Sequence, residues 1–227
     1  GGNMRLAAYP PGKGDITNMI RSYIHRCQKD GVKIVMNCEV TPELIKEEKP
    51  DSVIIATGSK TLILPIKGID NPAIIHGSDL LDGKRAAGKK VLVVGGGMVG
   101  CETAAFLGEQ EHDVTVIEFR DTVGADVIHE HRVYLMKDFE DYGIKEITGA
   151  KVCKFYEDGV EYETADGVRH ETRGYDSVIL SMGFRNYNPL EEKIKDLVPE
   201  THVIGDAIRA RRALDATKEA YAVASKL

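Results

Sequence analysis

The 227-residue sequence predicts an α/β fold with parallel sheets and an antiparallel β-meander. Short apolar runs, typical of strands buried on both faces, occur at residues 51–57, 91–94, 113–117 and 176–181. Stretches with apolar residues at helical spacing lie between such runs. The third observation is a segment of alternating residues, 151–172, which is interrupted by Asp158-Gly159 and Asp166-Gly167, dipeptides favoured in hairpin turns.

The composition is ordinary for a globular protein, with 42% hydrophobic and 29% charged residues. A net charge of −6 argues against a nucleic-acid partner. We expect no membrane span, because no apolar run approaches the roughly 18 residues that a span needs. We also expect no signal peptide. The four cysteines are far apart and none forms C-x-x-C, so we expect small buried side chains, no zinc site and a cytoplasmic location.

The first third of the chain predicts alternating helices and strands. Residues 1–14 are expected to form a loop, and apolar residues 16, 19, 20, 23, 24 and 27 predict one face of a helix that Asp15 caps and Gly31 ends. A strand is predicted at Val32–Met36. Thr41-Pro42 predicts the start of a short helix that ends near Glu48. The strand at residues 51–57 runs into Gly58, and the connector 64–88, with a short helix at residues 78–81, is a candidate domain junction.

The remaining two thirds predict a strand–helix–strand unit at residues 89–118, a helix at 125–142 and a strand at 144–148. The meander follows, with strands at 151–156, 159–164 and 168–172. The strand at 176–181 ends in Met182-Gly183 and closely repeats the sequence of residues 51–58. A polar connector with a short helix, a strand at 201–204 and a final helix at 210–227 complete the chain.

A glycine motif follows the strand Val91–Val94. Gly95, Gly97 and Gly100 fit G-x-G-x-x-G, in which the glycines permit a tight turn, close approach of a pyrophosphate and close packing of helix on strand. Glu118 ends the next strand, about 20 residues further on, where the ribose hydroxyls of a dinucleotide are expected. The motif therefore predicts a Rossmann-like dinucleotide site, with a tight turn in some other α/β protein as the alternative.

Two groups of residues would bind the dinucleotide. The phosphates would contact backbone N–H groups of Gly95, Gly96, Gly97, Met98, Val99 and Gly100. Glu118 would accept hydrogen bonds from the ribose and repel a 2′-phosphate, which favours NADH, unless it is an ordinary acid at a strand end. The candidate segment continues through Phe119 to Arg120, which could pair with the 2′-phosphate of NADPH or be a solvated surface charge.

No metal site or catalytic set is predicted. His129 and His131 are two residues apart, so on a helix they do not face the same way, and no third ligand lies near them in the sequence. Both are expected to be solvated helix residues. No Ser-His-Asp set and no paired carboxylates stand out. We therefore expect the protein to position cofactors rather than to supply a catalytic side chain.

The order of these motifs resembles that of the two-dinucleotide-domain flavoprotein reductases. The glycine motif, Ala56-Thr57-Gly58, its repeat at Met182-Gly183 and Val203-Ile204-Gly205-Asp206-Ala207 carry this resemblance. Three further segments point to one subfamily of these reductases: residues 1–8, Pro10-Pro11-Gly12-Lys13 and residues 211–216. They are similar to the C-terminal half of the NADH:flavin oxidoreductases related to 2,4-dienoyl-CoA reductase, 2-enoate reductase and trimethylamine dehydrogenase.

The resemblance implies two Rossmann-like lobes. An FAD-type domain, residues 1–85 with 186–227, would be split by an inserted NAD(P)H domain, residues 86–185. The family's first FAD-binding G-x-G-x-x-G unit, its flavin barrel with FMN and its 4Fe–4S cysteines would precede Gly1. We therefore expect an excised fragment whose first lobe is incomplete and which holds FAD weakly or not at all.

The resemblance also implies residue roles. Glu102 would lie near the nicotinamide, although a first-turn acid that complements the helix dipole is an equal alternative. Gly183 would line the cleft where NAD(P)H meets flavin. Ala56, Thr57 and Gly58 would close over the FAD adenosine. The flavin ribityl chain would bind Asp206, within Gly205-Asp206-Ala207.

The resemblance finally implies a function. In the whole protein, hydride would pass from NADH to FAD and electrons onward through the iron–sulfur cluster to FMN in the barrel, which reduces an activated C=C bond. The chain alone would bind nicotinamide dinucleotides without turnover, with the barrel of the same protein as its partner. A non-redox scaffold that binds ADP, as in trimethylamine dehydrogenase, is the alternative. A disulfide reductase is disfavoured because C-x-x-C is absent.

Overall fold

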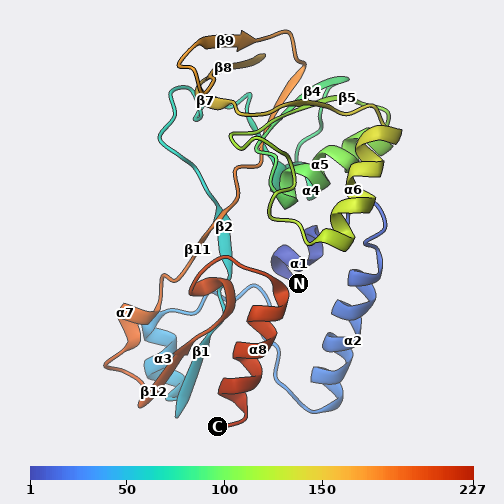
Figure 1. Cartoon of the computed structure of the whole chain (residues 1–227). Helices are drawn as coiled ribbons and strands as arrows, with labels where there is room; N and C mark the ends of the chain where they lie inside the picture. Colours follow the sequence, from blue (N-terminus) through green and yellow to red (C-terminus); the bar gives the residue numbers. More distant parts are fainter. The chain divides into compact units, whose positions relative to one another are not determined.

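The computed structural model describes all 227 residues and divides into two compact units (Figure 1). Unit 1 comprises residues 1–3, 19–60 and 184–227, and unit 2 comprises residues 4–18 and 61–183. The functional domain boundaries at residues 85/86 and 185/186 remain a prediction.

The helices and strands have the following bounds. The helices are α1 (Gly2–Leu6), α2 (Asp15–Lys29), α3 (Pro42–Glu48), α4 (Gly77–Leu81), α5 (Met98–Glu109), α6 (His129–Asp141), α7 (Glu191–Ile194) and α8 (Ala213–Ala224), with a 3-10 turn at Gly205–Ala207. The strands are β1 (Ser52–Ile55), β2 (Ser59–Thr61), β3 (Ile75–His76), β4 (Lys90–Val94), β5 (Asp113–Ile117), β6 (Lys145–Ile147), β7 (Lys151–Tyr156), β8 (Gly159–Glu163), β9 (Arg169–Thr172), β10 (Ser177–Leu180), β11 (Phe184–Asn186) and β12 (Glu200–Val203).

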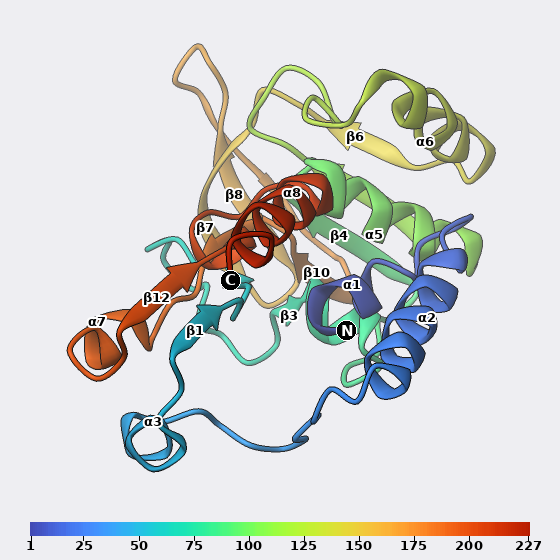
Figure 2. The same ribbon diagram turned by 90° about the horizontal axis from the view of Figure 1, so that it is seen from below.

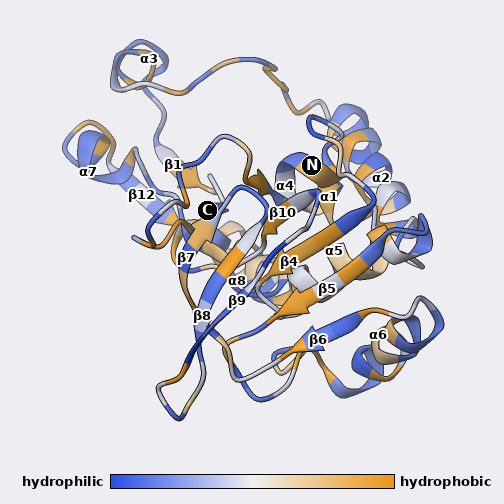
Figure 3. Ribbon diagram, turned by 90° about the horizontal axis from the view of Figure 1, so that it is seen from above, coloured by the Kyte–Doolittle hydropathy of each residue, from blue (hydrophilic) through white to orange (hydrophobic).

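A parallel sheet of order β3-β10-β4-β5-β6 forms the centre of unit 2, as the continuous apolar runs predict. Alternate residues of β4 face opposite layers. Val91 and Val93 pack in a cluster with α5 and α6, whereas Leu92 and Val94 pack in a second cluster with the meander. Figure 3 shows β4 and β5 mostly in the hydrophobic colour, and only their first residues, Lys90 and Asp113, are not buried, because both faces of these strands are covered.

The predicted meander is confirmed as the antiparallel sheet β7-β8-β9. It turns at Asp158-Gly159 and at Asp166-Gly167. Three side chains of the meander, Val152, Phe155 and Val160, are buried and pack in the same hydrophobic cluster as Leu92 of β4. The meander therefore closes the face of the parallel sheet that α5 and α6 leave open.

Unit 1 has a much smaller sheet, in which β1 pairs in parallel with β12 (Figure 2). Its core consists of few side chains: Ile45, Ile55, Leu190, Ile194, Val198 and Ala207. The predicted start of α3 is confirmed, because Thr41 Oγ1 accepts from Leu44 N at 3.3 Å and proline occupies the first turn. The α2 helix lies where predicted, but Asp15 is its first residue rather than its cap, and Asp15 Oδ1 accepts from Asn18 Nδ2 at 3.2 Å.

The strand predicted at Val32–Met36 is wrong. The segment has no regular structure, and its side chains are exposed, to 75% at Met36. The apolar run has the propensity for a strand, but a strand also needs a neighbour to pair its backbone groups, and the structure pairs none with this segment.

Two helices are shorter than predicted. The helix expected from residue 125 begins at His129, because residues 121–127 form turns in which Gly124 N donates to Gly96 O at 2.7 Å. The final helix begins at Ala213 rather than at residue 210. Asp215 Oδ2 accepts from Arg212 N at 3.2 Å there, which caps the first turn.

Candidate functional site

The glycine loop between β4 and α5 requires glycine at two of the motif positions. Gly95 has φ +107°, and a Cβ on it would lie 2.4 Å from Ser181 O on the neighbouring strand end. A Cβ on Gly100 would lie 1.8 Å from Gly95 O. These contacts are too short for any side chain, so the first and third glycines allow the helix to pack closely on the sheet.

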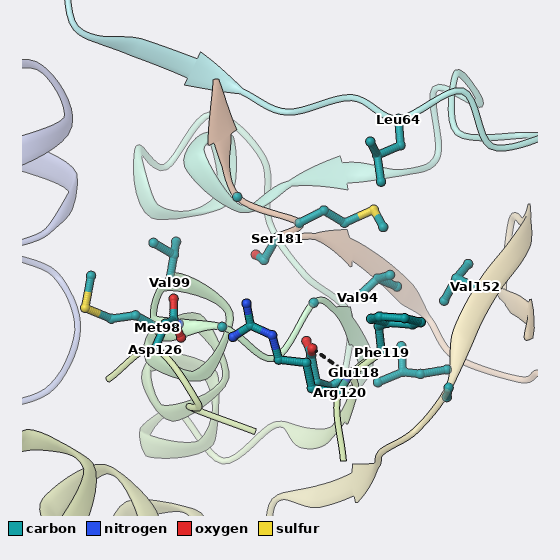
Figure 4. Close-up of a pocket in the computed structure, with 16 residues that line it drawn as sticks. Leu64, Val94, Met98, Val99, Glu118, Phe119, Arg120, Asp126, Val152 and Ser181 are labelled. Atoms are coloured by element: carbon teal, nitrogen blue, oxygen red, sulfur yellow. Dashed lines mark hydrogen bonds between the residues drawn. The ribbon is translucent and has the colours of Figure 1, made fainter. Parts of the chain in front are cut away.

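Gly97 differs from these two positions. Its φ of −72° suits any residue, and a Cβ there would meet first the carboxylate oxygens of Asp126, at 3.3 and 3.5 Å. Gly97 is the N-cap of α5 and provides no side-chain cap, so the first N–H groups of the helix need other partners. Met98 N donates to Asp126 Oδ1 at 2.9 Å, and Figure 4 shows this carboxylate beside the start of α5.

Glu118 lies where β5 ends, and its carboxylate binds two backbone groups. Oε2 accepts from Gly96 N at 2.6 Å, and Oε1 accepts from Arg120 N at 2.9 Å. A carboxylate offers about four acceptor positions, so each oxygen retains one for a further donor. Glu118 therefore both holds the glycine loop and keeps capacity for a ligand hydroxyl.

These elements surround a pocket of about 320 Å³. Eight predicted site residues line it: Gly95, Gly97, Met98, Val99, Glu118, Phe119, Arg120 and Gly183. Apolar side chains line the rest of the pocket: Leu64 from the connector after β2, Val94 and Ile117 from the sheet, and Val152 from the meander. Figure 4 shows Leu64, Val94 and Val152 on the side away from Met98 and Asp126. The pocket thus combines polar backbone groups at one end with apolar surface along the sheet.

A second pocket of about 480 Å³ shares Phe119 and Arg120 with the first. Lys151 and Thr164, from the meander, also line it. Two cationic side chains, Arg120 and Lys151, thus lie in its wall. The two pockets together extend from the start of α5 past the end of β5.

Glu102 does not line the first pocket. Its side chain is only 7% exposed and accepts from Lys13 Nζ, and His131 Nε2 lies 3.1 Å from the same carboxylate oxygen. His131 is therefore not the solvated helix residue that the sequence predicts, whereas His129 is exposed. The structure contains no group of three or more His, Cys, Asp or Glu residues placed to hold a metal ion.

The Cys101 thiol lies behind the glycine loop. It is fully buried, and its Sγ donates to Gly96 O at 3.2 Å. Burial raises the pKa of this thiol to about 12. All four cysteines are free.

The residues predicted to contact FAD lie in unit 1. Ala56, Thr57 and Gly58 follow β1, and Gly205–Ala207 form the turn after β12. Because β1 and β12 pair in parallel, these two loops leave the same edge of the sheet, as Ile204 N donating to Ile55 O at 3.0 Å illustrates.

Asp206 already has partners within unit 1. Its Oδ2 accepts from Ser59 Oγ and its Oδ1 from Arg211 N, both at 3.0 Å. The neighbouring Gly205 N donates to Glu219 Oε2 at 2.7 Å, and Glu219 also binds the guanidinium of Arg211 at 2.6 Å. Charged groups of α8 and of the segment just before it thus hold the turn in place.

Sequence reasoning missed Asp126, Lys13 and Ser181. Asp126 lies 28 residues after its partner Met98, and Lys13 lies 89 residues before Glu102. Neither residue type is unusual at its position, so no local signal could have identified them. Ser181 precedes the predicted Gly183, and its buried hydroxyl has no hydrogen-bond partner.

Comparison with known proteins gives one family. The family model described as pyridine nucleotide-disulphide oxidoreductase matches residues 12–204. No helix of the structure has the length and apolar character needed to cross a membrane.

Individual relatives match essentially the whole chain. The NADH oxidase of Thermoanaerobacter brockii is 32% identical over 99% of the chain, and the bilirubin reductase of Mediterraneibacter gnavus is 30% identical over 100% of it. Each is covered to 35%. The structure of a 2-naphthoyl-CoA reductase complex matches with a TM-score of 0.94 and 31% identity, over 100% of this chain and 34% of that one. The chain thus spans about a third of the length of these proteins.

Proposed function

The chain belongs to the pyridine nucleotide-disulphide oxidoreductase family, and we propose that it is the part of a flavin-dependent oxidoreductase that binds NADH and presents it to FAD. The predicted resemblance to the FAD/NAD(P)-binding part of the enoate-reductase-like flavoproteins is confirmed by the whole-chain matches. The four cysteines of this chain are free and far apart in the sequence, so the proposal gives none of them a redox role.

The observation that carries the proposal is the glycine loop at the start of α5. A Cβ would lie 2.4 Å from a backbone atom at Gly95 and 1.8 Å from one at Gly100, so the loop lets α5 pack closely on the sheet. The start of α5, with its first backbone N–H groups, lines one end of the pocket. A pyrophosphate suits such N–H groups because they carry the positive end of the helix dipole. These residues fit a nicotinamide dinucleotide.

Glu118 supports NADH as the preferred dinucleotide. Its remaining acceptor positions would take the ribose hydroxyls, and its charge would repel a 2′-phosphate. Arg120 and Lys151 in the adjoining pocket are the groups that would favour NADPH instead. The nicotinamide would then extend along the wall that Ser181, Met182 and Gly183 contribute to the first pocket.

The role of unit 1 in this proposal is to contact FAD. Ala56-Thr57-Gly58 and Asp206 lie on loops that leave one edge of the β1–β12 pair. The exposed apolar side chains of residues 32–40 support a larger FAD domain, completed in a longer protein by segments that this chain lacks. NADH would supply a hydride to FAD, and this chain's residues would bind and orient the two cofactors.

The whole protein would use these electrons on a conjugated, electron-poor double bond. Relatives named for bilirubin and for 2-naphthoyl-CoA, both conjugated molecules, support this substrate class. FMN and a 4Fe–4S cluster, held outside this chain, would complete the electron path. The chain alone would bind NADH without turnover.

Calorimetric titration with NADH and NADPH tests the proposal. Gly97→Ala should abolish measurable NADH binding without unfolding the chain, because the new methyl group enters the phosphate cradle while φ stays favourable. Glu118→Gln, which keeps one acceptor for the glycine loop, should weaken NADH binding about 10- to 100-fold, as expected for a lost charge-assisted hydrogen bond.

Two results would contradict the assignment. Unchanged NADH affinity in Gly97→Ala would remove the glycine loop from the site. Binding of ADP without any binding of NADH or NADPH would favour a nucleotide-binding scaffold over a reductase.

A further inference from the structure

The carboxylate of Asp126 occupies the start of α5, where a bound pyrophosphate would be expected. Oδ1 accepts from Met98 N at 2.9 Å, and Oδ2 is the atom nearest to a Cβ built on Gly97, at 3.3 Å. Asp126 lines the first pocket together with Gly97 and Met98, and Figure 4 shows Asp126 beside Met98. One of the exposed N–H groups of the phosphate cradle is therefore bound by an anion of the chain itself.

The loop that carries Asp126 is tied to its surroundings. Gly124 N donates to Gly96 O at 2.7 Å, and Val123 is 1% exposed. Arg132, on α6, donates from its guanidinium to Val123 O at 3.1 Å and to Thr122 Oγ1 at 2.9 Å. Asp126 itself is exposed, so solvent and ligands can reach its carboxylate.

We propose that Asp126 is an internal competitor for the dinucleotide phosphates and sets the affinity of the site by having to be displaced. The inference rests on the proposed function, because it assumes that the pyrophosphate binds at the glycine loop. A single N–H cannot donate fully to two anions, and a carboxylate a few ångströms from a doubly charged pyrophosphate repels it. Binding then requires displacement of the Asp126 carboxylate, so that the pyrophosphate replaces it at the positive end of the α5 dipole.

Two variants of Asp126 distinguish the effect of its negative charge from the effect of the space that its side chain fills. Asp126→Asn keeps an oxygen that can accept from Met98 N but removes the negative charge. Asp126→Ala removes both the charge and the occupant. Glu130→Gln, on an exposed first-turn residue of α6, removes the same charge away from the glycine loop and is the matched control.

The experiment is calorimetric titration of the four proteins with NADH at low and at high salt. Asp126→Asn should bind NADH about 5- to 30-fold more tightly than the unsubstituted chain at about 50 mM salt, and the advantage should shrink at about 0.5 M salt because salt screens the repulsion. Asp126→Ala should also bind more tightly. Glu130→Gln should change the affinity less than about twofold.

A thermal melt without ligand gives a readout that is independent of binding. Loss of the capping charge in Asp126→Asn should lower Tm by about 1 to 3 °C, so that the variant is less stable yet binds better. Equal or weaker NADH binding by Asp126→Asn, with binding by the unsubstituted chain, overturns this inference and leaves the proposed function intact. Absence of NADH binding by both overturns the proposed function as well.

Discussion

Two strands of this chain have nearly the same sequence and very different surroundings. β1 reads Ser-Val-Ile-Ile and β10 reads Ser-Val-Ile-Leu, and each is preceded by aspartate and followed closely by a glycine. Ile179 in β10 is completely buried, whereas the corresponding Ile54 in β1 is 40% exposed. β10 pairs with β3 and β4 on its two sides, but β1 pairs only with β12. An apolar strand sequence gives the capacity for burial, and its neighbours decide how much is realised.

The two units repeat this contrast. In unit 2, eight residues of α5 are buried. In unit 1, α8 buries none, and Tyr221 on it is 78% exposed. Most of the apolar free energy of folding is therefore expected from unit 2, since it scales with the apolar area that is removed from water.

The comparison of β10 with β1 gives the largest expected effect on stability. Ile179→Ala should lower the free energy of unfolding by about 3 to 4 kcal/mol, because it leaves a cavity in a closed core. Ile54→Ala should lower it by less than about 1 kcal/mol, since the side chain is partly in water already. Urea unfolding followed by circular dichroism measures both. Equal losses would mean that the burial difference does not exist in solution.

The buried carboxylate of unit 2 gives the next effect. Lys13→Met should destabilise unit 2 by about 2 to 3 kcal/mol, because Glu102 would lose its lysine partner while remaining 7% exposed. The double variant Lys13→Met/Glu102→Gln should recover part of this loss, since it also removes the buried negative charge, which His131 alone would otherwise have to balance. Hydrogen exchange of the α5 amides measures both variants, and a single-variant loss that the second change does not reduce would contradict the role of the pair.

An ion pair of unit 1 gives the smallest effect, and its sign follows from pKa. The Arg211 guanidinium and the Gly205 N–H stabilise the carboxylate of Glu219 and lower its pKa below the ordinary value of 4.5. Its contribution to stability is therefore complete above pH 4.5 and is lost as the pH falls through the lower, folded-state pKa. Glu219→Gln should show a smaller decrease in Tm between about pH 6 and pH 3 than the unsubstituted chain. Parallel pH profiles would exclude this contribution.

The sequence predicts the parts of the fold that depend on local pattern. The parallel strands of unit 2, the meander with its Asp-Gly turns and the capped start of α3 all follow from residues within a few positions of each other. Val32–Met36 shows the limit, because its pattern suits a strand but pairing depends on distant chain. The start of α6 was missed for a similar reason, since the turns before it are held by a bond to Gly96.

The candidate site divides in the same way. The glycine loop and the position of Glu118 follow from a motif in which spacing along the chain determines the geometry. Asp126, Lys13 and His131 reach their partners through tertiary packing, so their residue types alone carry no signal. Whether the motif residues bind a dinucleotide remains a prediction for the titrations described above.

The reaction rate of the buried Cys101 thiol, behind the glycine loop, can report how often unit 2 opens. A thiol with a pKa of about 12 and no exposed surface reacts with an alkylating reagent only when its surroundings open. Cys38 is exposed, and Cys27 and Cys153 are partly exposed, so these three thiols would be modified before Cys101. The rate at which Cys101 becomes alkylated would then report the opening of unit 2, and slowing of that rate by a nucleotide would measure binding without any substitution in the chain.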